Sequence, residues 1–379
     1  MSAALALVVL TLVLLAYTYV GYPVLIGALA RLSPLRLPER STPADADLPT
    51  ITVCLPVYNG AALMPAKLDS LLAQDYPAEK LDIIVYCDGC SDDTEAVARR
   101  IAAEPRAGGR ISVHASTDRL GKPTAINKVR ALARGQLLLL NDVRQPLSAN
   151  AARALAAPFR YPEMGCTTGN LVLTGGAGSG VYWRYENWIR RQESRFRSVV
   201  GMSGSIAMVR RDDLAPLPAD IILDDVWIPM QLRLQGRRVL FIAEAEAYDA
   251  AFDDDKEFRR KVRTLAGNYQ LFAMMPALLV PLRNPAWFET VSHKIMRLVA
   301  PWLMLALAAA TIAGVGQTTG ACAAVMVALG LAQAGFYAAA LVGQRAGRLT
   351  GVARTFVVLN AAAVVGLWRY VTGRQRITW

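Results

Sequence analysis

The first part of the chain is a long apolar run without charged side chains. It extends from Ala3 to Ala30 and ends at Arg31. A cleavable signal peptide is the alternative, and the segment Ala28-Leu29-Ala30 is similar to a cleavage site. However, no basic segment precedes the run, and the run is longer than the apolar part of a signal peptide. We therefore expect an uncleaved transmembrane anchor at residues 1–34.

Apolar runs recur near the other end of the chain. Two of them are uncharged, rich in Ala, Leu and Val, and about long enough to cross a hydrocarbon core of roughly 30 Å: 298–314 and 321–343. A third run, 355–368, is shorter and lies between Arg354 and Arg369. It spans the bilayer if these arginines extend to the headgroups, and otherwise it lies at the interface. The pattern predicts a C-terminal transmembrane region at residues 292–379 with two or three helices.

Between these ends, short apolar segments alternate with segments of helical character. The apolar segments are predicted to be strands: 51–57, 81–88, 110–116 and 136–142. The segments that follow the first three strands are predicted to be helices: 63–72, 92–101 and 122–134. Continuous apolar strands that alternate with helices predict an α/β domain. Its sheet is expected to be mostly parallel and Rossmann-like, with helices on both faces.

Polar side chains stand where three of the predicted strands end. They are Tyr58, Asp88 and Asp142. In a parallel sheet, ligands bind beyond the carboxyl ends of the strands. Turn chemistry alone explains any one of these residues, because Asn, Asp and Gly favour turns. Three such strand ends together indicate a binding site at this edge of the sheet.

The charge distribution and the residue types present indicate the location of the chain and exclude several classes of function. The net charge is +11, and much of the excess lies beside the apolar ends. The positive-inside rule explains this excess and places residues 31–297 in the cytoplasm. No basic stripe interleaved with aromatic residues is present, so we expect no nucleic-acid partner. With two histidines, a histidine-ligated zinc site is disfavoured, and neither a Walker A loop nor a GxSxG motif occurs.

Seven ordered motifs then give the chain a family resemblance. They are LPVYNG, CDGCSDDT, RLGKPTAINKV, NDVRQP, SGSIAMVRR, LDDVWIPMQLRLQGRR and FRRKVRT. Together they resemble membrane-bound family 2 glycosyltransferases such as cellulose, hyaluronan and poly-N-acetylglucosamine synthases, over about residues 50–300. The resemblance implies a GT-A-like catalytic domain at residues 35–268, on the cytoplasmic side of the inner (plasma) membrane. The segment 269–291 is broken by prolines and is expected to lie at the membrane interface.

The resemblance also implies roles for individual residues. Those matched to the nucleotide-sugar donor are Tyr58, Asp88, Lys122, Asn127, Asp142, Arg144, Arg260 and Arg263. Tyr58 and Asp88 would contact the nucleobase, and Asp142 the ribose and diphosphate. Residues matched to the acceptor loop are Gly204 and Ser205. Asp225, with Asp224 before it, matches the general base.

Two departures from the family pattern affect the cofactor and the acceptor. Arg144 stands at the second aspartate of the DxD motif, and Thr264 stands at the tryptophan of QxxRW, for which Trp227 is a candidate replacement. We expect Mg²⁺ or Mn²⁺ at Asp142, with Arg144 turned aside to pair with Asp225 or Glu186. The alternative gives Arg144 part of the metal's role, with help from Arg260 and Arg263, because a guanidinium pairs well with a diphosphate.

These assignments predict inverting transfer of a sugar from a nucleotide-sugar, expected to be UDP-linked, to a growing polysaccharide. An adjacent acidic pair at a helix start also serves as an N-cap, so Asp224 and Asp225 have a purely structural alternative. Single-sugar transfer to a lipid or polyprenyl-phosphate acceptor is the competing activity. The alternative that is not an enzyme is a membrane scaffold whose catalytic domain is inactive. A polymer synthase with so few helices would need an oligomer or an export partner.

Overall fold

Contacts divide the chain into two units. The computed structural model describes residues 3–35, 44–174, 180–250, 254–343 and 347–375. The sheet unit comprises residues 30–251 and 270–287, and the helical unit comprises residues 1–29, 252–269 and 288–375. Among the described residues, 254–269 group with the apolar helices and 270–287 group with the sheet.

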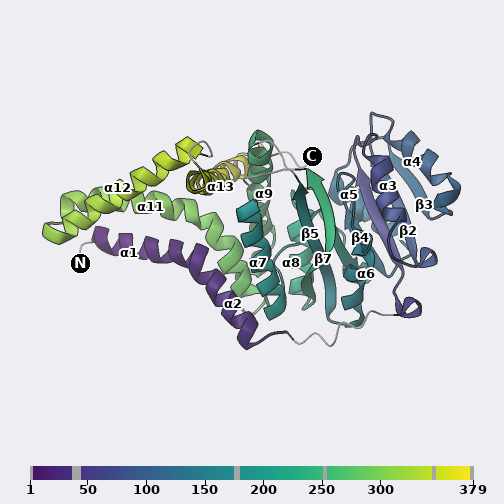
Figure 1. Ribbon diagram of the computed structural model, residues 1–379, viewed down its shortest axis with the longest axis horizontal. Coiled ribbons are helices and arrows are strands. Elements are labelled where there is room, and N and C mark those ends of the chain that lie inside the picture. Colours follow the sequence, from purple (N-terminus) through teal and green to yellow (C-terminus); the bar gives the residue numbers. More distant parts are fainter. Residues whose placement is uncertain (1–2, 36–43, 175–179, 251–253, 344–346, 376–379) are drawn as a thin grey trace. The chain divides into compact units, whose positions relative to one another are not determined.

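The sheet unit is built on seven strands in the order β3-β2-β1-β4-β6-β5-β7 (Figure 1). Their bounds are β1 Ile51–Val57, β2 Leu81–Asp88, β3 Ile111–Ser116, β4 Leu137–Asn141, β5 Met164–Thr174, β6 Ile206–Arg210 and β7 Arg238–Ala250. β6 pairs antiparallel with both neighbours, and every other pairing is parallel. The expected mostly parallel α/β sheet is therefore confirmed.

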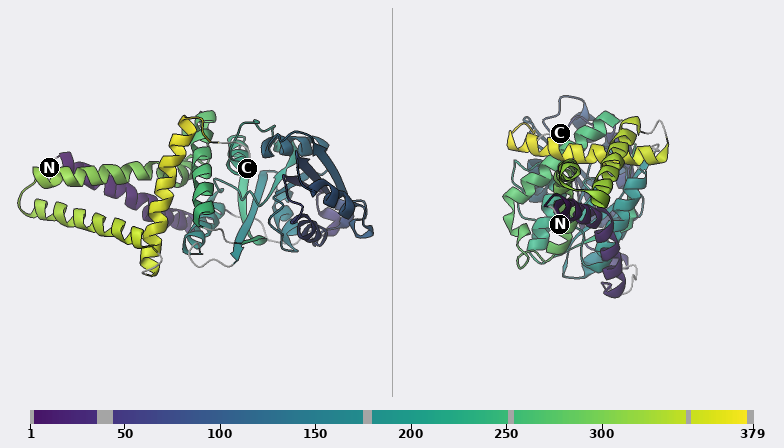
Figure 2. Two further views of the ribbon diagram at one scale, coloured as in Figure 1. Left: turned by 90° about the horizontal axis from the view of Figure 1, so that it is seen from above. Right: turned by 90° about the vertical axis from the view of Figure 1, so that its left-hand side faces the viewer.

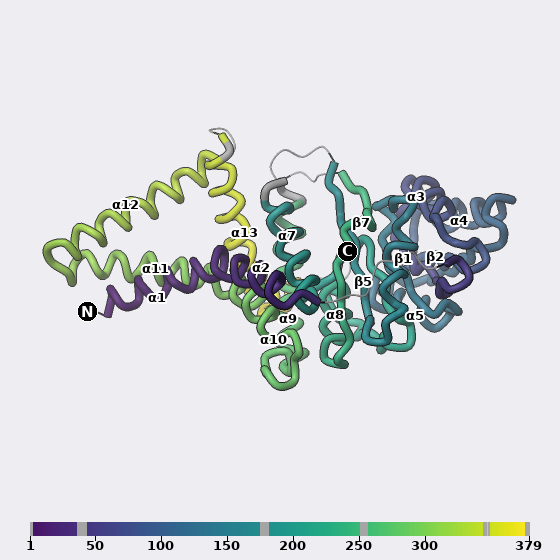
Figure 3. Tube along the Cα trace, turned by 60° about the horizontal axis from the view of Figure 1, so that its bottom comes forward, coloured from purple at the N-terminus to yellow at the C-terminus, as the bar shows by residue number. Residues whose placement is uncertain are grey.

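Helices cover both faces of this sheet. They are α3 Met64–Leu72, α4 Thr94–Ala102, α5 Lys122–Leu132, α6 Ala151–Ala156, α7 Gly180–Phe196 and α8 Asp224–Leu234. Figure 3 shows α3 and α4 on one side of β1 and β2, and α5 on the opposite side. The first strands and helices lie where the hydrophobic pattern predicts them. Every residue of β1 and of β4 is buried, as a strand covered on both faces requires.

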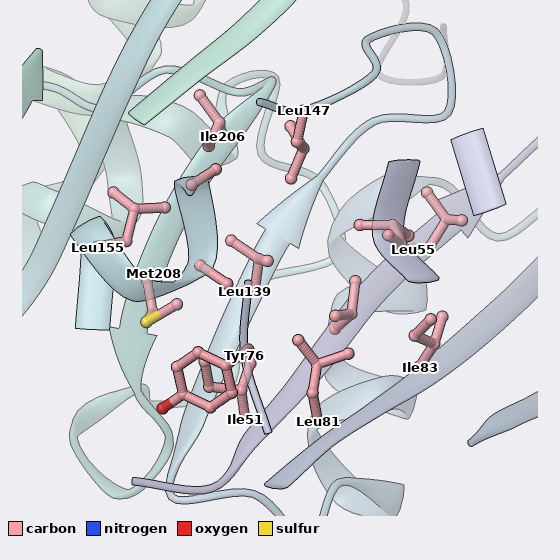
Figure 4. Packing of buried hydrophobic residues seen from close by; sticks show 14 of the residues in the cluster. Ile51, Leu55, Tyr76, Leu81, Ile83, Leu139, Leu147, Leu155, Ile206 and Met208 are labelled. Carbon is pink, nitrogen blue, oxygen red and sulfur yellow. The ribbon is translucent and has the colours of Figure 1, made fainter. Parts of the chain in front are cut away.

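The core of the sheet unit fixes the register of the strands. Figure 4 shows side chains from β1, β2, β4 and β6 interdigitating, among them Ile51, Leu81, Leu139 and Met208. Ile51 is opposite Leu81 on one side and Leu137 on the other. A shift of one residue would turn these apolar side chains to the wrong face of each strand. The register therefore brings the carboxyl ends of β1, β2 and β4 to one edge.

The helical unit contains four helices that are long and apolar enough to cross a membrane: Ala3–Leu32, Trp287–Gln317, Gly320–Val342 and Leu349–Val371. The first combines α1 Ala3–Ala16 and α2 Tyr22–Leu32 through one π-helical turn. The others contain α11 Met296–Gln317, α12 Gly320–Val342 and α13 Arg348–Val371. α1 lies beside α11, as the two views in Figure 2 show. α13 continues past both Arg354 and Arg369, so the short apolar run is part of a helix of spanning length.

The segment that follows the sheet is helical but interrupted. α9 extends over Asp254–Met274 and ends before Pro276, and the short helix α10 covers Trp287–Glu289. Gln270 lies in the part of this segment that belongs to the sheet unit, where its amide accepts the Ile222 N–H at 2.8 Å and donates to the Asp220 carbonyl at 2.8 Å. The prolines exclude a single straight helix here, as predicted. Its placement at a membrane interface remains a prediction.

Candidate active site

The candidate site begins at the carboxyl edge of β1, β2 and β4. Tyr58 follows β1 and Asp142 follows β4, while Asp88 is the last residue of β2. These strands are parallel neighbours, so the three residues come to the same edge. The guanidinium of Arg119 lies 3.7 Å from the centre of the Tyr58 ring, a cation–π contact. Arg119 belongs to the loop between β3 and α5. Its contact with Tyr58 was not predicted from the sequence.

Asp88 holds that same loop in place. Its carboxylate is buried and accepts the backbone N–H groups of Leu120 and Gly121, each at 2.8 Å. The neighbouring Gly89 has a φ of +64°, and a Cβ there would lie 2.5 Å from the Arg119 nitrogen. Only glycine allows this approach. The Asp88-Gly89 pair therefore positions the chain just before Lys122, in addition to any contact with a nucleobase.

Lys122 is the centre of the charge cluster. Its ammonium lies 2.8 Å from Asp142 Oδ1 and 3.1 Å from Asp224 Oδ2. It also lies 3.5 Å from the carbonyl oxygen of Gly204. Burial lowers the pKa of Lys122, but the charges of Asp142 and Asp224 outweigh burial and raise it above its ordinary value. The lysine is therefore a fixed cation that joins the end of β4 to the start of α8.

Asp225 lies beside this cluster. The first turn of α8 carries Asp224 and Asp225, and the backbone carbonyl of Asp225 accepts the Met202 N–H at 2.9 Å. A methyl group built on Gly204 would lie 3.6 Å from Asp225 Oδ2 and 3.8 Å from the Lys122 ammonium. Gly204 thus faces the space between the predicted base and the cation. The fold brings Lys122, Asp142, Asp224, Asp225 and Gly204 together from separate parts of the chain.

Arg144 forms an ion pair that the sequence did not predict. Its guanidinium lies 2.8 Å from Asp249 Oδ2, near the end of β7. The expected pairing with Asp225 or Glu186 stays a prediction. The Gln145 amide donates to the same oxygen at 2.7 Å. β7 pairs with β5 and lies against the loop after β4, where the Tyr248 N–H donates to the Pro146 carbonyl. Asp249 was missed in the sequence because β7 lies far along the chain.

A buried lysine, Lys67, also contacts the loop after β4. The Lys67 side chain is fully buried in α3, and its ammonium donates to the Gln145 carbonyl at 2.6 Å. Burial lowers the pKa of Lys67 to about 7, an effect that the charge of Asp142 partly offsets. The burial of Lys67 could have been predicted from the sequence, because Lys67 lies on the same helical face as Met64, Leu68 and Leu71.

The other residues matched to the donor or acceptor have structural contacts. The Asn127 amide donates to the Leu217 carbonyl and accepts its N–H, each at 2.8 Å. The Ser205 hydroxyl lies 2.7 Å from that of Ser203. Trp227 is 8% exposed, so little of its ring is open to an acceptor sugar. Asn127 and Ser205 thus stabilise the loops around the site, whatever they contact in a complex.

Arg260 and Arg263 lie in the part of α9 that belongs to the helical unit. Both the Nε and Nη2 atoms of Arg260 lie 3.0 Å from the carboxylate of Glu257, and these hydrogen bonds lower the pKa of that carboxyl despite its burial. Thr264 Oγ1 donates to the Arg260 carbonyl at 3.0 Å. Contact of Arg260 and Arg263 with the nucleotide-sugar donor remains a prediction.

The residues present fit a metal ion that the donor helps to hold. Within the described ranges, no group of three or more His, Cys, Asp or Glu side chains could ligate an ion. Asp142 is 39% exposed, and a single carboxylate suffices when substrate phosphates supply other ligands, as Mg²⁺ sites often show. Asp142 is therefore the residue that would hold such an ion, together with a diphosphate.

Comparison with known proteins agrees with this geometry. The family described as Glycosyl transferase family 2 matches residues 52–217, which include β1 to β4 and the cluster residues Lys122, Asp142 and Gly204. The chain carries a family 2 glycosyltransferase domain. The family resemblance found in the motifs is thereby confirmed.

Relatives of the glycosyltransferase domain bear related names. An N-acetylglucosaminyltransferase of Rhizobium meliloti (strain 1021) is 32% identical over 178 residues, which is 45% of this chain and 41% of that protein. One from Rhizobium sp. (strain N33) is 30% identical over 199 residues, covering 48% and 43%. The chain thus spans less than half the length of these curated relatives.

A solved structure shares the fold along nearly the whole chain. It is a mannosyltransferase, PcManGT, from Pyrobaculum calidifontis, in complex with GDP-Man and Mn²⁺. The TM-score is 0.73, with 23% identity, over 97% of this chain and 99% of that one. The GT-A-like fold of the glycosyltransferase domain is confirmed by this likeness.

Proposed function

We propose that this chain is an inverting glycosyltransferase that takes a sugar from a nucleotide-sugar. The observation that carries the proposal is the convergence of Asp142, Lys122 and Asp225 at the carboxyl edge of the sheet in a family 2 domain. The names of the relatives make a UDP-linked N-acetylhexosamine the first donor to test. GDP-mannose is the second, because a protein of the same fold is solved with it.

Asp225 is proposed as the general base. Inversion requires a base that takes the proton of the acceptor hydroxyl while its oxygen attacks the anomeric carbon from the side opposite the leaving group. Asp225 fits because its Oδ2 lies close to Gly204, within 4 Å of a position that the Lys122 ammonium also approaches, and Asp224 pairs with Lys122. Asp224 therefore acts as a positioning residue for Lys122 in this proposal.

The donor diphosphate is proposed to lie beside Asp142 and Lys122. The diphosphate leaving group gains negative charge as the glycosidic bond breaks, and nearby cations stabilise that charge. Asp142 would hold Mg²⁺ or Mn²⁺ jointly with the diphosphate, and the ion would supply further positive charge. Tyr58, stacked by Arg119, is the proposed platform for the nucleobase.

Two acceptors are proposed for the same chemistry. A growing polysaccharide is the first, by the family resemblance. Single-sugar transfer to a lipid or polyprenyl phosphate is the second, and the helices of spanning length fit an acceptor that lies in the membrane. The four apolar helices fit a membrane-associated enzyme. We further propose an inner-membrane location with the catalytic domain in the cytoplasm.

The test is donor turnover by the full chain purified in detergent. A panel of UDP- and GDP-sugars is incubated with membrane lipid extract, and the released nucleoside diphosphate and the product length are measured. Release with at least one donor is expected, and Asp225→Asn should lower it by about 100-fold or more. Asp212→Asn is the matched control, because Asp212 is 82% exposed on the far end of β6.

The outcomes separate the candidates. A ladder of products indicates polymer synthesis, and one added sugar indicates the single-transfer enzyme. Wild-type turnover by Asp225→Asn would refute the assignment of the base. No release with any donor would leave the inactive scaffold as the better description.

A further inference from the structure

The strongest unassigned feature of the site is the position of the Lys122 ammonium. It lies between two carboxylates from different elements, Asp142 after β4 and Asp224 at the start of α8. Its side chain is 12% exposed, and the Asp224 side chain is 10% exposed. A cation so placed satisfies both carboxylates at once and leaves the remainder of Asp142, which is 39% exposed, facing outward.

A divalent ion bridging these two carboxylates would need the same space. Mg²⁺ and Mn²⁺ bind carboxylate oxygens at about 2.0–2.2 Å and demand a compact, nearly octahedral shell. The ammonium already lies within hydrogen-bond distance of one oxygen of each carboxylate. Placing a second cation between them would require Lys122 to leave, or would bring two positive charges into contact.

Two other basic side chains near the loop, Arg144 and Lys67, contact groups other than the Asp142 and Asp224 carboxylates. Arg144 is paired with Asp249, whose oxygen also accepts the Gln145 amide. The Lys67 ammonium donates to the Gln145 carbonyl. Lys122 is therefore the cation that neutralises the Asp142 and Asp224 carboxylates in this arrangement.

We propose that Lys122 is the resident cation of the site and takes the place that a bridging divalent ion would have between Asp142 and Asp224. The chain then binds Mg²⁺ or Mn²⁺ only when a nucleotide diphosphate supplies the remaining ligands. Asp142 is the one side chain of the protein that ligates the ion. The nucleotide part of this inference rests on the proposed function, whereas the position of the lysine does not.

The experiment measures Mn²⁺ binding directly, without turnover. The full chain in detergent is titrated with Mn²⁺, and the electron paramagnetic resonance signal of free Mn²⁺ is followed, first without nucleotide and then with UDP or GDP. Wild type is expected to leave the free signal unchanged without nucleotide and to take up the ion once a nucleotide is present. Lys122→Met exposes both carboxylates, so it should bind Mn²⁺ alone at least about tenfold more tightly than wild type.

Two further variants make the result specific. Lys122→Arg keeps the charge and should behave like wild type, and Lys122→Met combined with Asp142→Asn should lose the gained binding. Thermal unfolding reports whether each variant is folded. Tight binding of Mn²⁺ alone by wild type would overturn the inference, and this measurement needs no variant. A folded Lys122→Met without any gain would overturn it as well.

These outcomes are independent of the proposed activity. A chain that releases no nucleoside diphosphate from any donor would fail the proposed function, while the Mn²⁺ titration without nucleotide would still decide the role of Lys122. Conversely, an active transferase whose wild-type form binds Mn²⁺ alone would keep the function and lose the inference.

Discussion

The guanidinium of Arg144 lies 2.8 Å from the carboxylate of Asp249, which connects the loop after β4 to the end of β7. Arg144 stands where a DxD motif has its second aspartate. The Asp249 side chain is 4% exposed, and its carboxylate is paired with the Arg144 guanidinium and accepts the amide of Gln145. Arg144 is thus part of a partly exposed ion pair that connects the loop carrying Asp142 to β7.

This ion pair predicts a coupled loss of stability. Asp249→Asn and Arg144→Ala should each destabilise the chain by about 1–3 kcal/mol, with the lower end favoured because Arg144 is 43% exposed. The double variant should cost less than the two single losses added together, because the second substitution removes a group that the first left without its partner. Thermal unfolding of the four proteins in detergent measures the coupling. Strictly additive losses would show that the pair contributes nothing.

Asp88 is predicted to act on the site through the loop before Lys122. Asp88→Asn retains one acceptor oxygen but presents an amide donor to the Leu120 or Gly121 N–H, at a cost of about 1–3 kcal/mol. We expect a lower unfolding temperature together with weaker nucleotide binding, measured by calorimetry. Asp118→Asn in the same loop is the matched control, because its side chain is exposed. Equal behaviour of the two variants would contradict the positioning role.

Gly204 is predicted to be required because it is small and not because of its backbone freedom. In Gly204→Ala the new methyl would meet Asp225 and Lys122 at 3.6–3.8 Å, which are ordinary contacts, so the unfolding temperature should stay close to wild type. The methyl would nevertheless occupy the space between base and cation, and donor turnover should fall by about tenfold or more. Gly335→Ala serves as control, since nothing lies within 4 Å of that position. Unchanged turnover in Gly204→Ala would place the reacting groups elsewhere.

Lys67 predicts a specific dependence of stability on pH. Burial lowers its pKa from 10.5 to about 7 in the folded chain. Between these values the unfolded chain binds the proton and the folded chain does not. The free energy of unfolding therefore rises with pH across this window, and the cost of the buried charge is fully present below pH 7. The total effect is on the order of a few kcal/mol.

Removing that lysine should flatten the profile. Lys67→Met is expected to unfold at a higher temperature than wild type at pH 6–7 and to lose the advantage toward pH 10. The exposed Lys128→Met controls for the loss of a positive charge. Parallel profiles of wild type and Lys67→Met would show that Lys67 keeps an ordinary pKa.

Much of the sheet unit followed from local pattern. The strands at 51–57 and 81–88 agree with the structure residue by residue, and the helix at Lys122 begins where it was predicted. Such patterns succeed because a buried strand must be apolar along its length and a helix needs apolar residues on one face. The strand-end residues Tyr58, Asp88 and Asp142 were found for the same reason.

The sequence alone determined the alternation of strands and helices, the apolar segments near both ends and the motifs of a glycosyltransferase domain, because each is encoded by residues that lie close together along the chain. The tertiary structure decided which cation neutralises which carboxylate. Lys122 rather than Arg144 joins Asp142, and Arg144 joins Asp249, because β4, α5, α8 and β7 meet only after the sheet has formed. Charge pairing depends on distances of a few ångströms between distant segments, and no pattern along the chain records those distances.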